Sequence, residues 1–307
     1  MQLGIVGLGR MGGNMAERIL RDSDHDVVVF DHDPAAIDRL EGLGAVGIYS
    51  LDQLVTALDG RRAIWVMVPA GESTKQVIDA LAEQLSPGDI VIDGGNSRWS
   101  DTVARFGALQ DLGIHLVDVG TSGGIHGLTN GYCMMVGGET EPIKWITPIL
   151  DVLAPASDVQ RGPGWLHVGD SGAGHYVKMV HNGIEYGMMR ALAEGLGIMS
   201  ASEFELDLGA ISQLWTRGSV VRSWLVELLA KALDEEGDEL NSLRPVVSDS
   251  GEGRWTVDEA VRLRVPAPVI AASLFSRFAS QGHDDFAGKV TAALRAQFGG
   301  HAVTRTS

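Results

Sequence analysis

The chain has 307 residues, which is enough for two domains that each bury a core of their own. Its formal net charge of −16 argues against nucleic acid or an anionic membrane as a partner, because both favour a basic protein surface. The single cysteine excludes an intrachain disulfide, and no apolar run is long enough to span a bilayer. The first expected strand begins at Gln2, which leaves no room for a signal peptide, so we expect a cytoplasmic protein.

Short apolar runs alternate with helical patterns over roughly the first 160 residues. Nearly continuous apolar runs are typical of strands that are buried on both faces of a sheet. Because helical patterns separate them, they indicate a doubly wound, mainly parallel sheet. We expect strands at Leu3–Val6, Asp26–Phe30, Ala63–Val68, Ile90–Asp93, His115–Val119 and Tyr132–Val136.

Beyond about Gly169 the strand patterns end and long helical patterns replace them. We therefore expect an α/β domain over residues 1–168 and an all-helical domain over residues 169–307, which ends in a C-terminal tail. The expected helices are Ala173–Ser202, Leu208–Trp215, Val220–Leu233, Thr256–Leu263, Pro268–Ser280 and Phe286–Phe298.

A glycine-rich motif follows the first expected strand and opens a helix. Its glycines are Gly7, Gly9 and Gly12, which would make the tight turn, admit a pyrophosphate and let helix and strand pack closely. An acidic residue, Asp31, ends the second strand about 20 residues later. This placement predicts a Rossmann-like, dinucleotide-binding first domain. The cofactor-binding residues in the turn are Gly7, Gly9, Arg10, Met11 and Gly12.

Asp31 also favours NAD over NADP. A carboxylate here accepts hydrogen bonds from the ribose hydroxyls and repels a 2′-phosphate, and Asp33 adds to that repulsion. The alternative is that Asp31 only caps a turn before Pro34. The segment Val68-Pro69-Ala70 lies at the end of the expected strand Ala63–Val68, so we expect it to line the cofactor crevice.

Two further segments follow expected strands and carry residue types that bind ligands. The first is Asp93-Gly94-Gly95-Asn96-Ser97, and the second is Gly120-Thr121-Ser122-Gly123-Gly124. The second offers consecutive backbone N–H groups, which form a nest for a carboxylate or phosphate. Either segment alone could be a structural turn.

A stripe of polar residues runs along the first helix of the second domain. Lys178, His181, Asn182 and Glu185 stand at i, i+3, i+4 and i+7, and at about 100° per residue they share one helix face. The other sides of the helix are mostly apolar, so we expect the helix to be buried. Burying these polar groups is costly unless they pair or face a ligand, which predicts an active site. The alternative is a solvated face of an ordinary amphipathic helix.

With these motifs the chain resembles the decarboxylating 6-phosphogluconate dehydrogenases, within the β-hydroxyacid dehydrogenase superfamily. The resemblance runs from end to end of the chain, and the helix motif is its most specific part. The matching segments are Gly7-Leu8-Gly9-Arg10-Met11-Gly12, Asp93-Gly94-Gly95-Asn96-Ser97, Ser122-Gly123-Gly124, Lys178 to Gly187, Val221-Arg222-Ser223, Gly253-Arg254-Trp255-Thr256 and Arg295 to His301.

The resemblance implies which residues surround the substrate. Around the sugar acid it implies Asn96, which also meets the cofactor, Ser122, Gly123, Gly124, Lys178, His181, Asn182 and Glu185. Around the phosphate it implies Tyr186, Arg222, Arg254, Thr256, Arg295 and His301. The last two lie in a tail that in this family reaches a neighbouring subunit, which implies a homodimer or homotetramer with shared active sites.

The chain departs from the longer family members in three respects. Arg254 stands where they usually carry lysine, Ile125 stands where an acidic residue is common, and the second half of their helical domain is missing. The resemblance is therefore to a short, often NAD-using branch of the family, which agrees with Asp31.

The implied reaction is oxidation of 6-phosphogluconate at C3 with reduction of NAD, then loss of CO2 to give ribulose 5-phosphate. Lys178 would move the proton of the C3 hydroxyl, Glu185 would protonate C1, and His181 and Asn182 would orient the substrate. No metal is expected, because the sequence has no metal-ligand motif.

Three alternatives stay open. The chain could oxidise another small β-hydroxy acid such as 3-hydroxyisobutyrate, although that substrate needs neither Glu185 nor the basic cluster. It could also be a non-catalytic NAD-sensing protein on the same fold. For His181 alone, a buried structural histidine is the competing interpretation.

Overall fold

A computed structural model describes residues 1–156, 162–282 and 285–299 of the chain. Its tertiary contacts divide the chain into two compact units, Met1–Met179 and Val180–Ser307. The division falls within one long helix, α8 (Ala173–Ser200), whose first two turns belong to the first unit. Each unit is described separately below.

The first unit is built on one sheet whose strand order is β3-β2-β1-β4-β5-β6-β7-β8. Neighbouring strands are parallel except for β7, which runs antiparallel to β6. The expectation of a mainly parallel sheet is therefore confirmed. The strands are β1 (Gln2–Val6), β2 (Asp26–Phe30), β3 (Val46–Ile48), β4 (Ala63–Val66), β5 (Ile90–Asp93), β6 (His115–Ser122), β7 (Cys133–Gly137) and β8 (Trp165–Gly169).

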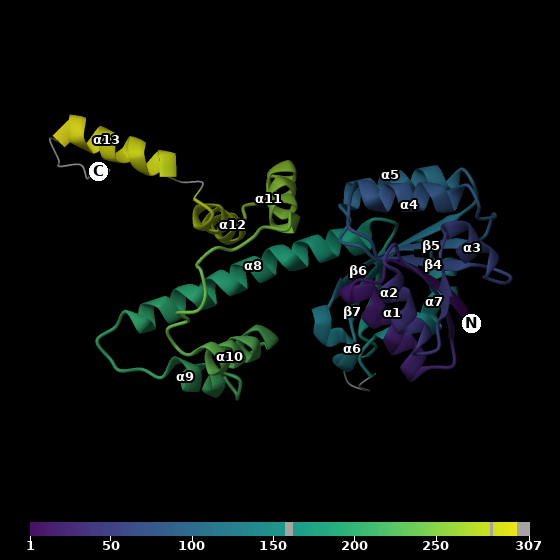
Figure 1. The fold of residues 1–307 in the computed structure, drawn as a ribbon. Coiled ribbons are helices and arrows are strands. Elements are labelled where there is room, and N and C mark those ends of the chain that lie inside the picture. The colour runs from purple at the N-terminus through teal and green to yellow at the C-terminus, as the bar shows by residue number, and fades with distance from the viewer. Residues whose placement is uncertain (157–161, 283–284, 300–307) are drawn as a thin grey trace. The chain divides into compact units, whose positions relative to one another are not determined.

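Helices cover both faces of this sheet (Figure 1). On β2, Val27 and Val29 face one core cluster while Val28 and Phe30 face the other, as the alternation of side chains along a strand requires. Two buried faces explain why the strands read as continuous apolar runs. One face packs against α1 (Arg10–Asp22), α2 (Pro34–Glu41) and α7 (Thr140–Leu153), and the other against α3 (Leu51–Thr56), α4 (Glu72–Ala82) and α5 (Trp99–Gln110).

The sheet topology brings several loops to one edge. Strands β1, β4, β5 and β6 are parallel neighbours, so their carboxyl ends lie along the same edge. The chain order reverses between β1 and β4, which is the switch point where ligands bind in open α/β sheets. The segments after these four strands are the ones that carry the predicted cofactor and substrate residues.

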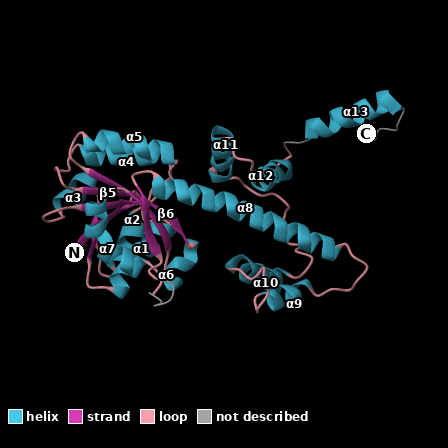
Figure 2. Ribbon diagram, turned by 180° about the vertical axis from the view of Figure 1, so that it is seen from behind, coloured by secondary structure: helices cyan, strands magenta, loops and turns pink. Residues whose placement is uncertain are grey.

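In the described part of the second unit there are helices and loops but no strands, as expected. Helices α9 and α10 pack on each other and on the last turns of α8 around Leu196, Leu208 and Leu233, and α11 packs on α12. Figure 2 distinguishes these helices from the strands of the first unit by colour. The helices are α9 (Leu208–Trp215), α10 (Trp224–Glu236), α11 (Glu252–Leu263), α12 (Pro268–Ser280) and α13 (Asp285–Gly299).

Two helix starts differ from the expectation. Helix α10 begins at Trp224 and not at Val220, because the Ser223 hydroxyl caps it by accepting a hydrogen bond from the Val226 N–H at 3.3 Å. Helix α11 begins four residues earlier than expected, so that Arg254 lies in its first turn. Among the described helices, none combines the length and apolar character that crossing a membrane would require.

Candidate active site

The glycine-rich turn after β1 has the geometry of an anion cradle. Gly7 has a φ of +93°, and a Cβ on Gly12 would lie 2.0 Å from the Gly7 carbonyl oxygen, so neither position admits a side chain. A Cβ on Gly9, in contrast, would meet nothing within 4 Å. Gly9 also caps α1 without a side-chain hydrogen bond, which leaves the helix N-terminus available to a negative charge. These residues fit the pyrophosphate of a dinucleotide.

Asp31 connects this turn to the end of β2. One carboxylate oxygen accepts a hydrogen bond from the Leu8 N–H at 2.5 Å, and the other accepts one from the Asp33 N–H at 2.9 Å. Helix α2 is capped by Asp33, whose side chain accepts a hydrogen bond from Ala35. Each Asp31 oxygen has a second lone pair, so the carboxylate can accept ribose hydroxyls as well as bracing the turn.

The segment after β4 lies along the same edge. The strand ends at Val66, two residues before the expected end at Val68, although the Met67 N–H still donates to the Val6 carbonyl of the neighbouring strand at 2.7 Å. The Pro69 carbonyl accepts a hydrogen bond from the buried Thr74 hydroxyl at 2.9 Å, which ties this segment to the first turn of α4. Ala70 is exposed.

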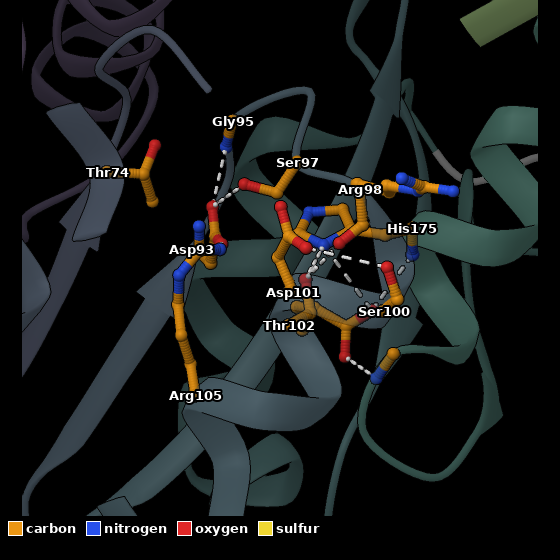
Figure 3. Close-up of polar contacts among 12 residues, drawn as sticks. Thr74, Asp93, Gly95, Ser97, Arg98, Ser100, Asp101, Thr102, Arg105 and His175 are labelled. Atoms are coloured by element: carbon orange, nitrogen blue, oxygen red, sulfur yellow. Dashed lines mark hydrogen bonds and ion pairs between the residues drawn. The ribbon is translucent and has the colours of Figure 1, made fainter. Parts of the chain in front are cut away.

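After β5, only one of the polar residues in the predicted ligand segment is exposed. Asp93 and Ser97 are buried and bonded to each other, as Figure 3 shows, whereas Asn96 between them in the chain is exposed. Asn96 is therefore the side chain of this segment that a ligand can reach.

The prediction that Gly120–Gly124 forms a loop is wrong for its first three residues. Gly120, Thr121 and Ser122 belong to β6 and pair with Met135, Met134 and Cys133 of β7. Antiparallel pairing uses alternate backbone groups of a strand, so the predicted nest of consecutive free N–H groups is confined to Gly123 and Gly124. Both have positive φ, at +132° and +53°, and lead into a short 3₁₀ turn, η1 (Gly124–His126), and then α6 (Gly127–Asn130).

Lys178 packs directly on the backbone of β6. A Cβ on Gly120 would lie 2.3 Å from the Lys178 Cβ, so the absence of a side chain at residue 120 allows the helix to approach the strand. The Lys178 residue is 8% exposed. It thus lies at the carboxyl end of β6, on the edge of the sheet that carries the glycine-rich turn and Asn96.

A buried carboxylate on β6 anchors the helix that carries Lys178. Asp118 is fully buried and accepts hydrogen bonds from the Gly172 N–H at 2.6 Å and the His175 N–H at 2.9 Å. A carboxylate at a helix N-terminus interacts favourably with the helix dipole. The His175 ring also bonds the Thr102 hydroxyl of α5 at 2.7 Å (Figure 3). Sequence analysis missed this anchor, although an aspartate within an apolar strand is a visible signal.

The next residues of the polar stripe belong to the second unit. The His181 ring bonds the Asn182 amide oxygen at 3.0 Å, and the Asn182 amide donates to Glu252 of α11 at 3.3 Å. Helix α11 comes close at this point, because a Cβ on Gly183 would lie 2.6 Å from Thr256. Glu185 is half-buried.

Tyr186 is the centre of a polar cluster in the second unit. Its hydroxyl donates to Asp249 at 3.2 Å, and Arg254 pairs with the other oxygen of Asp249 at 2.7 Å. The Arg277 guanidinium of α12 lies 3.5 Å from the centre of the Tyr186 ring, a cation–π contact. Asp249 and Arg277 were not predicted, because they belong to a loop and a helix without a motif of their own.

The remaining predicted phosphate residues are not all brought together. Tyr186, Arg254 and Thr256 lie around the contact of α8 with α11, while Arg222 is exposed in the turn before α10. Arg295 belongs to α13, and its side chain is outside the described part of the chain. His301 lies outside the described residues altogether.

The expectation that the whole helix is buried is wrong for the single chain. Lys178, Met179 and Tyr186 are buried, but Ile184, Met188 and Met189 of α8 are 51%, 41% and 41% exposed. These three apolar side chains are therefore only partly covered by the described residues. Among the described residues, no group of three or more histidine, cysteine or acidic side chains is arranged to hold a metal ion.

Comparison with known proteins identifies the family. Residues 2–162 match the NAD binding domain of 6-phosphogluconate dehydrogenase, and residues 174–298 match the C-terminal domain of 6-phosphogluconate dehydrogenase. The chain belongs to the 6-phosphogluconate dehydrogenase family. The family inferred from the sequence motifs is thereby confirmed, and with it a dinucleotide-binding enzyme fold.

The proteins similar to this chain differ in length and in the cofactor that their names give. An enzyme of Haloferax volcanii named as an NAD(+)-dependent, decarboxylating 6-phosphogluconate dehydrogenase is 41% identical over 99% of both chains. An NADP(+)-dependent enzyme of Bacillus subtilis is 36% identical over 91% of this chain but only 61% of its own length. The structure of the Plasmodium falciparum 6-phosphogluconate dehydrogenase superimposes with a TM-score of 0.83 at 25% identity, over 100% of this chain and 66% of the longer one.

Proposed function

We propose that the protein oxidises 6-phosphogluconate at C3 and decarboxylates the product to ribulose 5-phosphate and CO2, with NAD as the hydride acceptor. The observation that carries this proposal is the burial of Lys178 on Gly120, at the sheet edge that also holds the glycine-rich turn and Asn96. This arrangement supports an amine acting next to the cofactor. The match of the chain over almost its full length to an NAD(+)-dependent decarboxylating relative supports the same reaction.

The proton transfers are assigned to two residues of α8. Lys178, in its neutral form, takes the proton of the C3 hydroxyl as the hydride leaves C3 for the bound nicotinamide. It then returns the proton to the C3 oxygen as the bond from C2 to the carboxylate breaks and CO2 departs, which leaves an enediol. Glu185, two turns along the helix, protonates C1 of the enediol.

Orientation of the sugar acid is assigned to His181, Asn182 and Asn96. The tether from Asn182 to Glu252 of α11 supports this role, because a side chain held on two sides is preorganised for its ligand. Ser122, Gly123 and Gly124 are also assigned to the substrate, the last two through their backbone groups, with open space next to Gly124.

For the cofactor, we propose NAD. Asp31 is placed to accept the ribose hydroxyls and to repel a 2′-phosphate, and Gly7, Gly9, Arg10, Met11 and Gly12 surround the pyrophosphate. Val68, Pro69 and Ala70 would line the nicotinamide end.

The phosphate end of the substrate requires cations, which this acidic chain supplies sparingly. We assign the phosphate to Tyr186, Arg222, Arg254 and Thr256 of one subunit and to Arg295 and His301 of its partner, in a homodimer or homotetramer. The exposed apolar residues of α8 support association, since contiguous apolar surface is usually covered by a partner. The location of the enzyme in the cytoplasm stays a prediction.

Measuring NADH formation and CO2 release with 6-phosphogluconate tests this function directly. We expect one NADH and one CO2 per substrate, and little or no turnover of 3-hydroxyisobutyrate at the same concentration. NADH without CO2, or a preference for the smaller acid, would favour the dehydrogenase alternative. NAD binding without turnover of either acid would favour a sensing protein.

A further inference from the structure

We propose that Asp93 is the positioning residue for Asn96. Its buried carboxylate, braced by Arg105, holds the backbone on both sides of Asn96 and so fixes where the Asn96 amide meets substrate and cofactor. The role assigned to Asp93 rests on the proposed function only in requiring that Asn96 contacts a ligand.

The contacts of Asp93 account for both flanks of Asn96. One carboxylate oxygen accepts a hydrogen bond from the Gly95 N–H at 3.2 Å and another from the Ser97 hydroxyl at 3.1 Å, as shown in Figure 3. Gly95 precedes Asn96 and Ser97 follows it. A single oxygen thus fixes the two neighbours of the exposed residue, while Asp93 itself is fully buried at the end of β5.

The second carboxylate oxygen is held from a different element. Arg105 of α5 donates to it at 3.0 Å, and the Arg105 side chain is only 10% exposed. A buried carboxylate is costly without a positive partner, so the ion pair with Arg105 offsets the cost of burying Asp93 at the end of the strand. Hydrogen bonds in which one partner is charged are stronger than those between neutral groups.

The first residues of the loop that carries Asn96 are packed closely against β4 and the segment that follows it. The Gly94 N–H bonds the Val66 carbonyl at 3.0 Å, and a Cβ on Gly94 would lie 2.0 Å from the Trp65 ring nitrogen. A Cβ on Gly95 would lie 3.2 Å from the Val68 carbonyl oxygen. The loop therefore packs on the end of β4 and on Val68, in the segment that is expected to line the cofactor.

The same strand provides a matched control at its opposite end. Asp89, immediately before β5, is also buried and pairs with Arg62 at 3.1 Å. It also accepts hydrogen bonds from the backbone N–H groups of Arg62 and Ser86, both at 2.9 Å. The two carboxylates share burial, an arginine partner and two further donors, but only Asp93 lies at the edge that carries the predicted ligand residues.

The experiment compares Asp93→Asn with Asp89→Asn in the full-length enzyme. Both should lower the melting temperature, because each weakens a buried ion pair. Only Asp93→Asn should raise the KM for 6-phosphogluconate and lower kcat, with a combined loss of about 10- to 100-fold, the scale of a misplaced binding group. Asp89→Asn should stay within about 2-fold of the wild type, because Asp89 lies at the opposite end of β5 from the predicted ligand residues.

A double-mutant cycle distinguishes positioning from a general structural effect. If Asp93 acts through Asn96, the double variant Asp93→Asn with Asn96→Ala should be no slower than Asn96→Ala alone, because coupled residues are non-additive. Additive losses, or equal kinetics for Asp93→Asn and Asp89→Asn, would overturn the proposal. Ser97→Ala keeps the ion pair between Asp93 and Arg105 but removes the hydrogen bond from the Ser97 hydroxyl to Asp93. It should therefore also raise the KM for 6-phosphogluconate, at a nearly unchanged melting temperature. This variant keeps the test possible if Asp93→Asn fails to fold.

The dissociation constant for NAD separates this proposal from the proposed function. If the wild type does not turn over 6-phosphogluconate, the function is wrong, but the same variants can be compared by their affinity for NAD. Weaker binding in Asp93→Asn, Ser97→Ala and Asn96→Ala, with Asp89→Asn unchanged, would still support the role of Asp93. Equal affinities in all four variants would then contradict it.

Discussion

The position of Lys178 depends on residues of β6 that hold the first turns of α8. Gly120 removes the side chain that would keep the helix away, and Asp118 holds the first amides of α8 through Gly172 and His175. An amine held on a strand in this way would be preorganised for the proposed proton transfer, and such positioning lowers a reaction barrier. Glu185 follows on the same helix and is half-buried.

Replacing either of these two residues should cost activity without loss of the fold. General acid–base groups typically contribute about 10²–10⁴-fold, so Lys178→Met and Glu185→Gln should each lower kcat by about two decades or more. Steady-state kinetics measure the loss, and circular dichroism checks the fold. Glu194→Gln is the matched control, because Glu194 lies on the same helix and is exposed in a pair with Arg190. Near-wild-type turnover in Lys178→Met or Glu185→Gln would contradict the assigned role.

Asp31 combines a structural and a selective role, and two substitutions separate them. Asp31→Ser should raise the KM for NAD and lower the ratio of kcat/KM for NAD to that for NADP, because the repulsion of the 2′-phosphate is lost. Asp31→Asn keeps an acceptor for the Leu8 N–H and should retain more of the affinity for NAD than the serine variant. A ratio that both substitutions leave unchanged would show that Asp31 only braces the turn.

At the scale of elements, the buried strands could be predicted and the half-exposed ones could not. The apolar runs of β1, β2, β4 and β5 are visible because both faces of those strands are buried. Strands β3 and β8 are largely half-exposed, so their sequences have no continuous apolar run and were missed. The extension of β6 through Gly120–Ser122 was also missed, because it depends on pairing with β7 and not on local sequence.

The candidate site could be predicted where residues form a motif within one element. The stripe on α8 and the glycine-rich turn are motifs of this kind. The groups that hold them are brought together from distant parts of the chain, as Thr102 and Asp118 are with His175. Asp249, which accepts from Tyr186 and pairs with Arg254, is a further case. No spacing in the sequence connects such residues, so only the folded chain reveals them.

The turn between α6 and β7 contains a buried hydroxyl whose removal should stabilise the first unit. Tyr132 is fully buried, and its hydroxyl has no hydrogen-bond partner among the described residues. A buried unsatisfied polar group costs about 1–3 kcal/mol, so Tyr132→Phe should raise the free energy of unfolding by about 1 kcal/mol at neutral pH. Denaturant unfolding measures this change. Tyr49→Phe is the control, because Tyr49 is exposed and should have little effect.

The same substitution should alter stability at alkaline pH. Burial raises the pKa of Tyr132 to about 12, whereas an unfolded tyrosine titrates near pH 10. Below about pH 10 Tyr132 is neutral in both states, whereas between about pH 10 and 12 the unfolded chain loses this proton and the folded chain keeps it, so the free energy of unfolding of the wild type falls as the pH rises. Tyr132→Phe has no such loss, so its advantage over the wild type should grow from pH 9 to pH 11. If the advantage of Tyr132→Phe stays constant with pH, burial does not raise the pKa of Tyr132 in the folded protein, and the prediction is wrong.

At the scale of the whole molecule, the exposed apolar residues of α8 and the proposed phosphate site both bear on whether a second subunit is needed. Ile184, Met188 and Met189 are exposed on α8, and of the predicted phosphate residues Arg222 is exposed in the turn before α10. Arg254 is already paired with Asp249. A phosphate group needs more positive charge than this, and a bidentate arginine from the tail of a second subunit would supply it.

Mixing two inactive variants tests whether Arg295 reaches the partner's site. Lys178→Met subunits carry an intact tail, and Arg295→Ala subunits carry an intact lysine. In a mixed dimer with shared sites, one of the two sites then contains both wild-type residues. Random exchange makes about half of the dimers mixed, so about a quarter of wild-type activity should return in a closed two-fold dimer.

The control mixture combines Lys178→Met with Glu185→Gln, whose positions lie on one helix of one chain. Because Lys178 and Glu185 enter each site together, every site in that mixture carries one defective residue and no activity should return. Recovery in the first mixture and none in the second requires that the tail crosses between subunits while the helix stripe does not. Absence of recovery in both mixtures, after native mass spectrometry has verified subunit exchange, would mean that Arg295 serves its own chain or no site at all. If Arg295 serves no site, the phosphate would have to be held without it, by Tyr186, Arg222, Arg254, Thr256 and His301.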